Sequence, residues 1–353
     1  MILPTTYLAA LLLLVLSTFC LGSWQNAQKL TGKWRFELFY YDFSVGVALV
    51  AVIAAYTFGS MNPSDLTFQD NFLLTGYRKM ANAAAAGVVL NLGNLLLLAA
   101  ITVAGMGIAF PMAVGFALVI GVIWQYLLNQ QGSAGLLFGG ALVVLGAVIA
   151  AAFTHAERLA DKAAQDKGPP KYDPRTKTIV RPPSGVKGIV LSLLSGLFFS
   201  LFYPLLDISR TGDDAISPYG IALLLAGGIL FSTLLYNPFL MNFPVVGDPI
   251  HFRDFFKGTR RQHLAGVLGG IVFGTGMIAS LVAATAPKRL QVGSGLSLAL
   301  SMAPAVIGAL WGLLVWRELR GSGTRVKSLA IAVLVLFIAG LVLVSMAPSF
   351  GTS

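Results

Sequence analysis

The sequence predicts an all-α polytopic membrane protein with ten transmembrane helices, arranged as two inverted five-helix repeats. The chain has 353 residues, of which 56% are hydrophobic and only 11% are charged, and the charges leave long stretches free of them. Soluble domains carry about 25% charged residues, so this composition excludes a soluble protein. A helix needs about 20 apolar residues to cross a bilayer, so the number and length of the charge-free stretches predict the number of helices.

The first half of the chain is predicted to hold five of these helices. Charge-free stretches at 1–28 and 43–64 hold one helix each, and the stretch 80–156, interrupted by AGMG and NQQGS, has room for three. The first stretch lacks the positive n-region and the cleavage site of a signal peptide, so we interpret it as a membrane helix. The predicted helices are about 5–22, 42–59, 81–104, 106–127 and 134–153.

The second half is predicted to hold the same number after a linker at 154–187. This linker, THAERLADKAAQDKGPPKYDPRTKTIVRPPSGVK, is polar, basic and rich in proline, as expected of a solvated segment. It separates a first repeat at 1–153 from a second repeat at 188–346. The predicted helices of the second repeat are about 188–207, 216–237, 262–285, 291–316 and 326–346, followed by a tail at 347–353.

Two sequence echoes indicate that the halves are repeats of one another. VIGVIWQYL (119–127) aligns with VIGALWGLL (306–314) at five identities in nine, and GVVLNLGN (87–94) aligns with GIVFGTGM (270–277) at three in eight. Because each half has an odd number of helices, the second half must be inserted upside down. Inverted repeats of this kind are typical of transporters, with the substrate site near the midplane between the repeats. The alternative is a set of ten unrelated helices.

The positions of the basic residues predict the orientation. Of the 24 Lys and Arg, 19 lie in segments 23–41, 154–187, 238–261 and 317–327, and 5 lie in the loops on the other side. The positive-inside rule then places the 154–187 linker in the cytoplasm and both termini outside. This distribution accounts for the net charge of +10 without a nucleic-acid partner. A bacterial inner membrane is the simplest location.

The sequence predicts no metal site and no cofactor. The three histidines, His155, His251 and His263, all fall in or beside loops, where we expect no intramembrane metal or acid–base role. The single cysteine, Cys20, allows no internal disulfide. The midplane of the ten predicted helices carries no charged residue, which favours a neutral polar or zwitterionic substrate.

Polar side chains within the predicted helices are the candidates for substrate binding. Asn91 and Asn94 are three residues apart on one helix face, and an amide offers both donors and an acceptor. Thr275 and Ser301 lie at similar depth in the second half. The alternative for the asparagines is hydrogen bonding between helices, and for Thr275 and Ser301 it is a bond to their own helix backbone.

Aromatic residues and prolines supply further candidates. Trp124 and Trp311, which align in the repeat, are placed to stack on a flat substrate or to anchor the helices at the membrane interface. Tyr203, a further substrate-binding candidate, and Asp207 close the outer end of the sixth helix. Proline removes a helix hydrogen bond. The candidate bending points of the paired fourth and ninth helices are therefore Pro111 and Pro304.

Two acids precede the second helix. Glu37 is four residues from Lys33 and is expected to pair with it or to act as a proton carrier. Asp42 has no base within one turn and stands directly before the apolar run, so it is either a helix N-cap or the acid that couples transport to protons.

Two stretches carry a resemblance to a known family. WRFELFYYDFSVGV (34–47), followed by TFG at 57–59, and GIAFPMAVGFALVIG (107–121) resemble the ureide permease family of the drug/metabolite transporter superfamily, to which glucose/ribose and rhamnose porters are related. The resemblance implies uptake of small polar metabolites such as allantoin, other ureides, nucleobases or sugars, usually coupled to protons. Some plant members are described with a nucleotide-binding-like motif in the central loop. This linker has no GxxxxGK[ST], so we expect no ATP binding.

The sequence therefore predicts a secondary active transporter that takes up a neutral ureide or nucleobase by alternating access, coupled to protons. The alternatives on the same fold are a sugar uptake permease and an exporter of amino acids or drugs. An intramembrane enzyme would need His, Asp, Glu or Cys clustered at one depth, and the sequence has no such cluster. The predicted partners are a small-molecule substrate, the lipid bilayer and protons, and the oligomeric state stays open.

Overall fold

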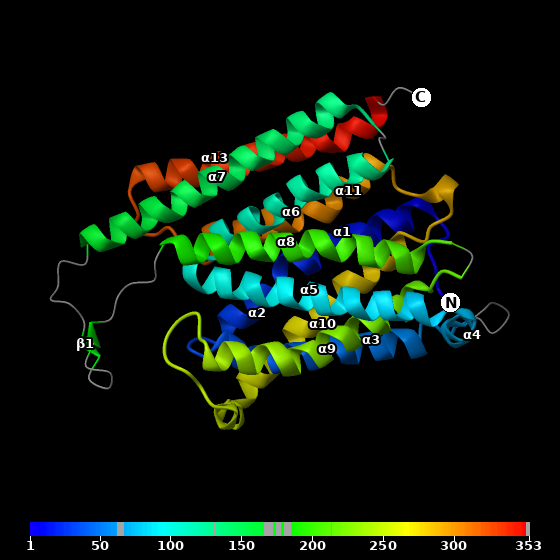
Figure 1. Ribbon diagram of the computed structural model, residues 1–353, viewed down its shortest axis with the longest axis horizontal. Helices are drawn as coiled ribbons and strands as arrows, with labels where there is room; N and C mark the ends of the chain where they lie inside the picture. The colour runs from blue at the N-terminus through cyan, green and yellow to red at the C-terminus, as the bar shows by residue number, and fades with distance from the viewer. Residues whose placement is uncertain are drawn as a thin grey trace.

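The computed structural model describes residues 1–61, 67–129, 132–165, 172–173, 178–179, 185–212 and 214–350. Within these residues, ten helices are long and apolar enough to cross a membrane, as the sequence predicts. They run side by side along the long axis of the molecule (Figure 1). Both chain termini lie at one end of the bundle, here called the terminus end (Figure 1). The strand β1 (Tyr172–Asp173) lies toward the opposite end, here called the linker end (Figure 1).

The first half contains five of the spans and one short helix at the terminus end. The first span is broken at Trp24 into two helices. A capping box between Thr67 and Asp70 fixes the start of the short helix α4. The elements are α1 (Tyr7–Ser23), α2 (Gln25–Leu30), α3 (Phe36–Tyr56), α4 (Phe68–Leu74), α5 (Tyr77–Ala104), α6 (Met106–Asn129) and α7 (Ala134–Gln165).

The second half contains the other five spans, and its fourth span is broken. Two short strands, β1 (Tyr172–Asp173) and β2 (Thr178–Ile179), form an antiparallel pair in the linker. The helices are α8 (Gly185–Arg210), α9 (Pro218–Asn242), η1 (Phe252–Lys257), α10 (Arg260–Ala283), η2 (Lys288–Leu290), α11 (Ser294–Met302), α12 (Pro304–Leu310), the π-helical turn η3 (Trp311–Val315), α13 (Thr324–Met346) and η4 (Ala347–Phe350).

The start of α3 and the end of α7 differ most from the predicted boundaries, and each has a physical reason. α3 begins at Phe36 rather than near 42, because Arg35 neutralises Glu37 and allows that acid to be buried in the first turn. Asp42 therefore lies inside the helix, and its predicted N-cap role is wrong. α7 continues to Gln165 rather than ending near 153, because this part of the linker is rich in Ala, Glu, Lys and Arg, which are strong helix formers.

Corresponding helices of the two halves have corresponding packing partners, as expected of two related repeats. α5 packs on α8 and α9, and its predicted counterpart α10 packs on α1 and α3. Each crossing of α3 with α10 and of α5 with α9 is made at glycines. A Cβ on Gly270 would lie 2.0 Å from the carbonyl oxygen of Phe43, and one on Gly228 would lie 2.3 Å from that of Ala84. These contacts are consistent with the inverted repeat, which stays a prediction.

Glycines also make the contact between α7 and α13, the last spans of the two halves. The two helices lie together at one edge of the bundle (Figure 1). A Cβ on Gly140 would lie 2.6 Å from Val344 Cγ2, and a Cβ on Gly340 would lie 2.6 Å from Val144 Cγ2. This reciprocal contact is the arrangement that a two-fold axis between the helices would give.

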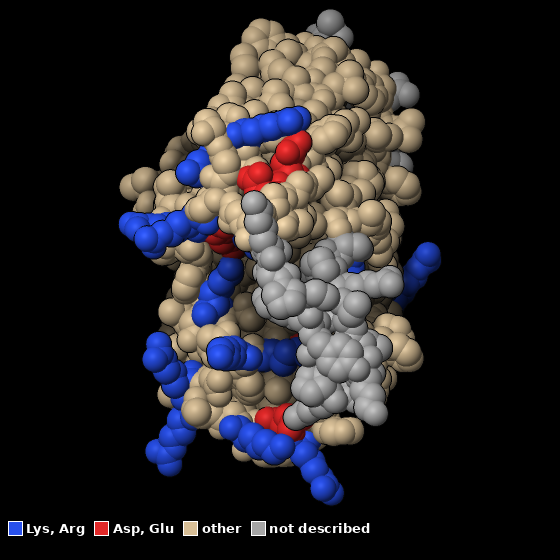
Figure 2. Space-filling model, turned by 90° about the vertical axis from the view of Figure 1, so that its left-hand side faces the viewer, with Lys and Arg blue, Asp and Glu red and all other residues tan. Residues whose placement is uncertain are grey.

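Basic side chains gather at the linker end. Figure 2 shows this end, with Lys and Arg spread over the surface and few acidic groups among them. The linker end is therefore the end that the positive-inside rule predicts to be cytoplasmic.

Candidate functional site

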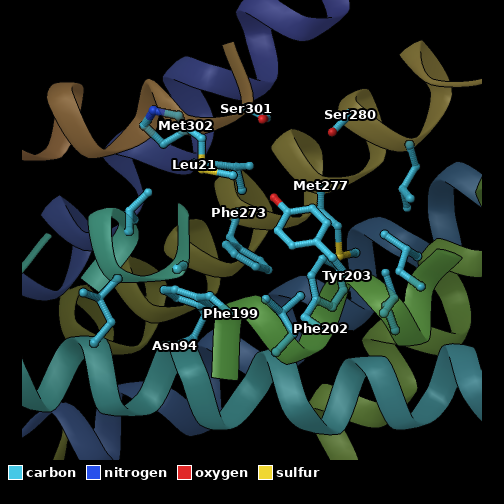
Figure 3. A pocket seen from close by; sticks show the side chains of 18 of the residues that line it. Leu21, Asn94, Phe199, Phe202, Tyr203, Phe273, Met277, Ser280, Ser301 and Met302 are labelled. Atoms are coloured by element: carbon cyan, nitrogen blue, oxygen red, sulfur yellow. The ribbon is translucent and has the colours of Figure 1, made fainter. Parts of the chain in front are cut away.

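A cavity of about 190 Å³ lies between the two halves. α1, α2, α5 and α6 line it from the first half, and α8 to α12 line it from the second. Figure 3 shows Asn94, Phe199, Phe202, Tyr203 and Phe273 around this space. Most of its wall is aromatic or aliphatic, which suits a small ligand with a flat, apolar face.

Two buried amides in this wall have hydrogen-bonding atoms that no described residue satisfies. Asn94 is 2% exposed, and its Nδ2 has no partner among the described residues. Gln25 is 1% exposed, and its Oε1 likewise has no partner there, although its Nε2 donates to the Leu21 carbonyl at 3.4 Å. Buried polar atoms are nearly always hydrogen-bonded. The wall of the cavity therefore contains one buried donor and one buried acceptor for which no hydrogen bond is found among the described residues.

The cavity is closed toward the linker end and open toward the terminus end. Trp24, Tyr40, Phe43 and Phe273, here called the aromatic floor, pack together with Trp24 and Phe43 ring centroids 4.6 Å apart. In the other direction the lining reaches Arg210 and Ala284, both exposed, at the terminus-end tips of α8 and α10. The cavity is therefore accessible from the end that carries the termini.

The cavity brings together three of the predicted substrate-binding residues. Asn94, Ser301 and Tyr203 all line it. Ser301 Oγ donates to the Leu298 carbonyl of its own helix at 2.8 Å, which was the alternative for this residue. Tyr203 is 43% exposed, so its ring is accessible from the open side of the cavity.

The other predicted substrate-binding residues lie elsewhere. Asn91 faces α9, where its Nδ2 donates to Ser232 Oγ at 2.8 Å and to Thr233 Oγ1 at 3.1 Å. This is the arrangement expected of a residue that joins helices. The remaining three residues are outside the cavity lining: Thr275 on α10, Trp124, which is 50% exposed on α6, and Trp311, whose Nε1 donates to Ser23 Oγ at 2.9 Å.

The two candidate bending prolines and Asp207 lie at different places relative to the cavity. Pro111 lies inside α6, next to the cavity residue Phe110. Pro304 lines the cavity and begins α12, so the ninth span breaks where the proline removes a backbone donor. Asp207 forms an exposed ion pair with Arg210 at 2.9 Å, at the mouth of the cavity.

Glu37 is a buried acid whose charge is neutralised next to it in the sequence. Arg35 donates to both carboxylate oxygens, at 2.6 and 3.1 Å, so the expected pairing with Lys33 is wrong. The Glu37 carbonyl accepts from Asn237 Nδ2 of α9 at 2.9 Å. This acid therefore fixes the start of α3 against the second half.

Asp42 has a basic partner that the sequence did not reveal. Asp42 Oδ2 lies 2.7 Å from Nδ1 of His263, in the first turn of α10. The sequence places His263 beside a loop, and the structure gives it an acidic neighbour in the second span. The ring of His263 packs edge-on against Trp34 and Phe255, at centroid distances of 4.9 and 4.7 Å. The pair is accessible at the linker end, where the His263 side chain is 29% exposed.

Sequence reasoning missed Gln25 and His263 because neither has a local signal of function. Gln25 stands in SWQNAQ, a polar stretch that ends the first apolar run and resembles an ordinary interface. His263 is 221 residues from Asp42, so only the crossing of α3 and α10 brings them together.

Comparison with known proteins agrees with this architecture. The family model of ureide permeases matches residues 39–178. Ureide permease 1 and Ureide permease 2 of Arabidopsis thaliana are each 25% identical to this chain, over 93% of it and 94% of their own length. A solved crystal structure that is 18% identical aligns with a TM-score of 0.50, over 95% of this chain and 98% of its own, which shows a shared fold alone.

Ten apolar spans define the class of protein as a multi-pass membrane protein, and the proteins to which it is similar are permeases. The chain is similar to the ureide permeases over most of its length. The second of the two resembling stretches, 107–121, and most of the first, from residue 39 on, lie within the region that the family model matches. The place of the chain in the wider superfamily, and its link to the sugar porters, stay predictions.

Proposed function

We propose that this chain is a secondary active transporter that takes up a ureide or a nucleobase by alternating access. The relatives are ureide permeases by name, and the cavity lies between two halves of five spans each. Exposed acceptors and donors are few in the cavity, so the substrate is small and neutral, with one planar polar group.

The free donor and acceptor of the cavity support this substrate class most directly. A ureido or lactam group presents a C=O and an N–H side by side in one plane, which complements Asn94 Nδ2 and Gln25 Oε1. Aromatic walls such as Phe199 and Phe273 suit the faces of such a ring. A sugar would leave most of its hydroxyls unpaired here, which costs free energy on binding.

The experiment that tests this substrate class is a thermal-shift screen with allantoin, uracil, sugars and amino acids, followed by uptake into proteoliposomes. A ligand that binds the folded state raises its unfolding temperature. We expect stabilisation by allantoin or uracil, lost in Asn94→Ala and Gln25→Ala but kept in the control Thr275→Val. Stabilisation by sugars or amino acids alone would discard the ureide and nucleobase assignment.

We further propose that transport is coupled to protons through Asp42 and His263. Two titratable groups share a hydrogen bond of 2.7 Å between helices of opposite halves, whereas Glu37 is already neutralised by Arg35. Asp42→Asn should keep substrate exchange and abolish accumulation driven by a pH gradient. Uphill uptake that is unchanged in this variant would contradict the coupling.

Asp254 provides a matched control for that experiment. The Lys257 ammonium, which donates to its carboxylate, holds the pKa of Asp254 below its ordinary value, so this acid stays ionised near neutral pH. It also lies at the linker end, in η1, outside the membrane spans. Asp254→Asn should leave pH-driven accumulation intact.

We propose a bacterial inner membrane location, with the linker in the cytoplasm and both termini outside. The basic side chains of the linker end support this orientation. In a Cys20→Ser background, an impermeant maleimide added to intact cells should label Thr6→Cys and spare Thr324→Cys. The reverse pattern would overturn the orientation without affecting the substrate assignment.

A further inference from the structure

Glu318 comes from the second half, but its carboxylate sits on the first turn of α6 in the first half. Its Oε1 and Oε2 accept from the backbone N–H groups of Met106 and Gly107, both at 2.9 Å. Lys29, just before the end of α2, donates to Oε1 at 2.5 Å. The Glu318 side chain is only 6% exposed. A carboxylate is favoured at this place, since the start of a helix presents free N–H groups and a partial positive charge.

Glycines make room for this carboxylate. A Cβ on Gly105 would lie 2.7 Å from Glu318 Oε2, and one on Gly312 would lie 2.8 Å from the same oxygen. Gly105 also has a φ of +87°, a backbone conformation that other residues rarely adopt. The Gly312 Cβ would in addition lie 2.4 Å from the Gly107 nitrogen. Both segments therefore approach one another closely only because glycine stands at these positions.

The backbone before Glu318 is irregular and strained. The ninth span ends in the π-helical turn η3, where Trp316 N–H donates to the Trp311 carbonyl at 3.0 Å. Arg317 follows with a φ of +48°, in the left-handed region, which an L-residue enters only at a free-energy cost. Strain of this kind concentrates at switch regions. Here it turns the chain so that Glu318 reaches α6.

Two further hydrogen bonds join the same parts of the two halves. Trp311 Nε1 donates to Ser23 Oγ at 2.9 Å, and Trp316 Nε1 donates to Asn26 Oδ1 at 2.6 Å. Together with Glu318, they bind the end of the ninth span to α1, α2 and α6. These contacts lie at the linker end, beyond the aromatic floor of the cavity.

We propose that Glu318 is the latch that keeps the linker end closed while the cavity is open at the terminus end. To admit water and substrate from the linker side, the end of the ninth span must separate from α6, and Glu318 must leave Met106 and Gly107. This proposal rests on the alternating access of the proposed function. It assigns to Glu318 a positioning role, because its carboxylate holds two helices together and does not line the cavity.

The test measures access to the cavity from the linker side. Ser301→Cys, in a Cys20→Ser background, places one thiol in the cavity wall. Inside-out vesicles, whose orientation is checked with Thr324→Cys, are treated with an impermeant maleimide. Glu318→Ala should raise the labelling rate of Ser301→Cys by about tenfold, the population shift expected when charge-assisted hydrogen bonds are lost.

Two more variants keep the proposal testable if Glu318→Ala does not fold. Glu318→Gln keeps the shape and removes the charge, so it should increase labelling less. Gly312→Ala keeps the Glu318 side chain but places a Cβ 2.4 Å from the Gly107 nitrogen and 2.8 Å from Glu318 Oε2, so it should push the ninth span away from α6 and increase labelling as well. Unchanged labelling in the folded members of this set would overturn the latch.

Glu157 supplies the matched control. Its Oε1 pairs with Arg325 Nη2 at 3.1 Å, also between the halves and also at the linker end, but on the outer helices α7 and α13. Glu157→Ala should leave labelling unchanged, and an equal increase would overturn a specific role for Glu318. No substrate enters the assay, so its result stands apart from the ureide assignment.

Discussion

The two ends of the molecule are held by different contacts. At the linker end, Glu318 and Trp316 join the ninth span to α2 and α6 across the path of the cavity. At the terminus end, Asn71 and Lys79 bind the chain between α8 and α9, on one side of the cavity only. The helices cross through the same kind of glycine contacts in both halves. The two ends therefore differ in the polar side chains that join the halves beyond the aromatic floor, and not in the kind of contact at which the helices cross.

The largest effect on the unfolding free energy is expected from a substitution at the glycine crossing of α3 and α10. Gly270→Val places a Cβ 2.0 Å from the Phe43 carbonyl oxygen, so α3 and α10 must move apart. We expect a loss of unfolding free energy of about 3 kcal/mol or more, which thermal unfolding in detergent measures. Gly227→Val, which meets no atom within 4 Å, is the control. Equal stability of the two variants would contradict the crossing.

A smaller effect on stability is expected from substituting Asn91, and none from substituting Asn94, the other asparagine of α5. Asn91→Leu removes hydrogen bonds to Ser232 and Thr233 and should lower the unfolding free energy by about 2 kcal/mol. Asn94→Leu removes an amide whose Nδ2 has no described partner, so stability should hold while ligand-induced stabilisation is lost. Similar losses of stability in both variants would remove the distinction between packing and binding.

Trp316→Phe tests one hydrogen bond of the linker end. The change keeps a ring but removes the indole N–H that donates to Asn26 at 2.6 Å. The unfolding free energy should fall by about 1 kcal/mol, measured by thermal unfolding. Asn26→Ala combined with Trp316→Phe should cost little more than either change alone. Full additivity would show that the two side chains act independently.

The smallest effect is expected at the terminus end. Asp207 and Arg210 form an exposed pair, with side chains 57% and 45% exposed. Asp207→Asn should change the unfolding free energy by no more than about 0.5 kcal/mol. Thermal unfolding at low and high salt checks this value. A large loss would mean that the terminus end also depends on its polar contacts.

The ten spans were predictable because each depends on local composition. An apolar run long enough to cross a bilayer folds as a helix there, whatever its neighbours are. Pro304 also signalled a break in the ninth span, and the structure has one. The early start of α3 was not predictable, since it depends on the ion pair that buries Glu37.

The candidate site was harder to predict because it depends on which way each helix faces. Asn91 and Asn94 are three residues apart, which separates them by about 60° around a helix of 3.6 residues per turn. α5 contacts α9 and also lines the cavity, so this angle turns Asn91 toward α9 and Asn94 toward the cavity. Glu318, in the charged stretch WRELR, resembles an ordinary loop acid until the fold brings it to α6.

The bond between α5 and α9 has a consequence for biosynthesis. Asn91 enters the membrane with the first half, but its partners Ser232 and Thr233 are synthesised 141 and 142 residues later. Until then its amide and the crossing face of Gly87 have only lipid or other early helices as neighbours. During synthesis, this face of α5 therefore stays unpacked until the seventh span is inserted beside it.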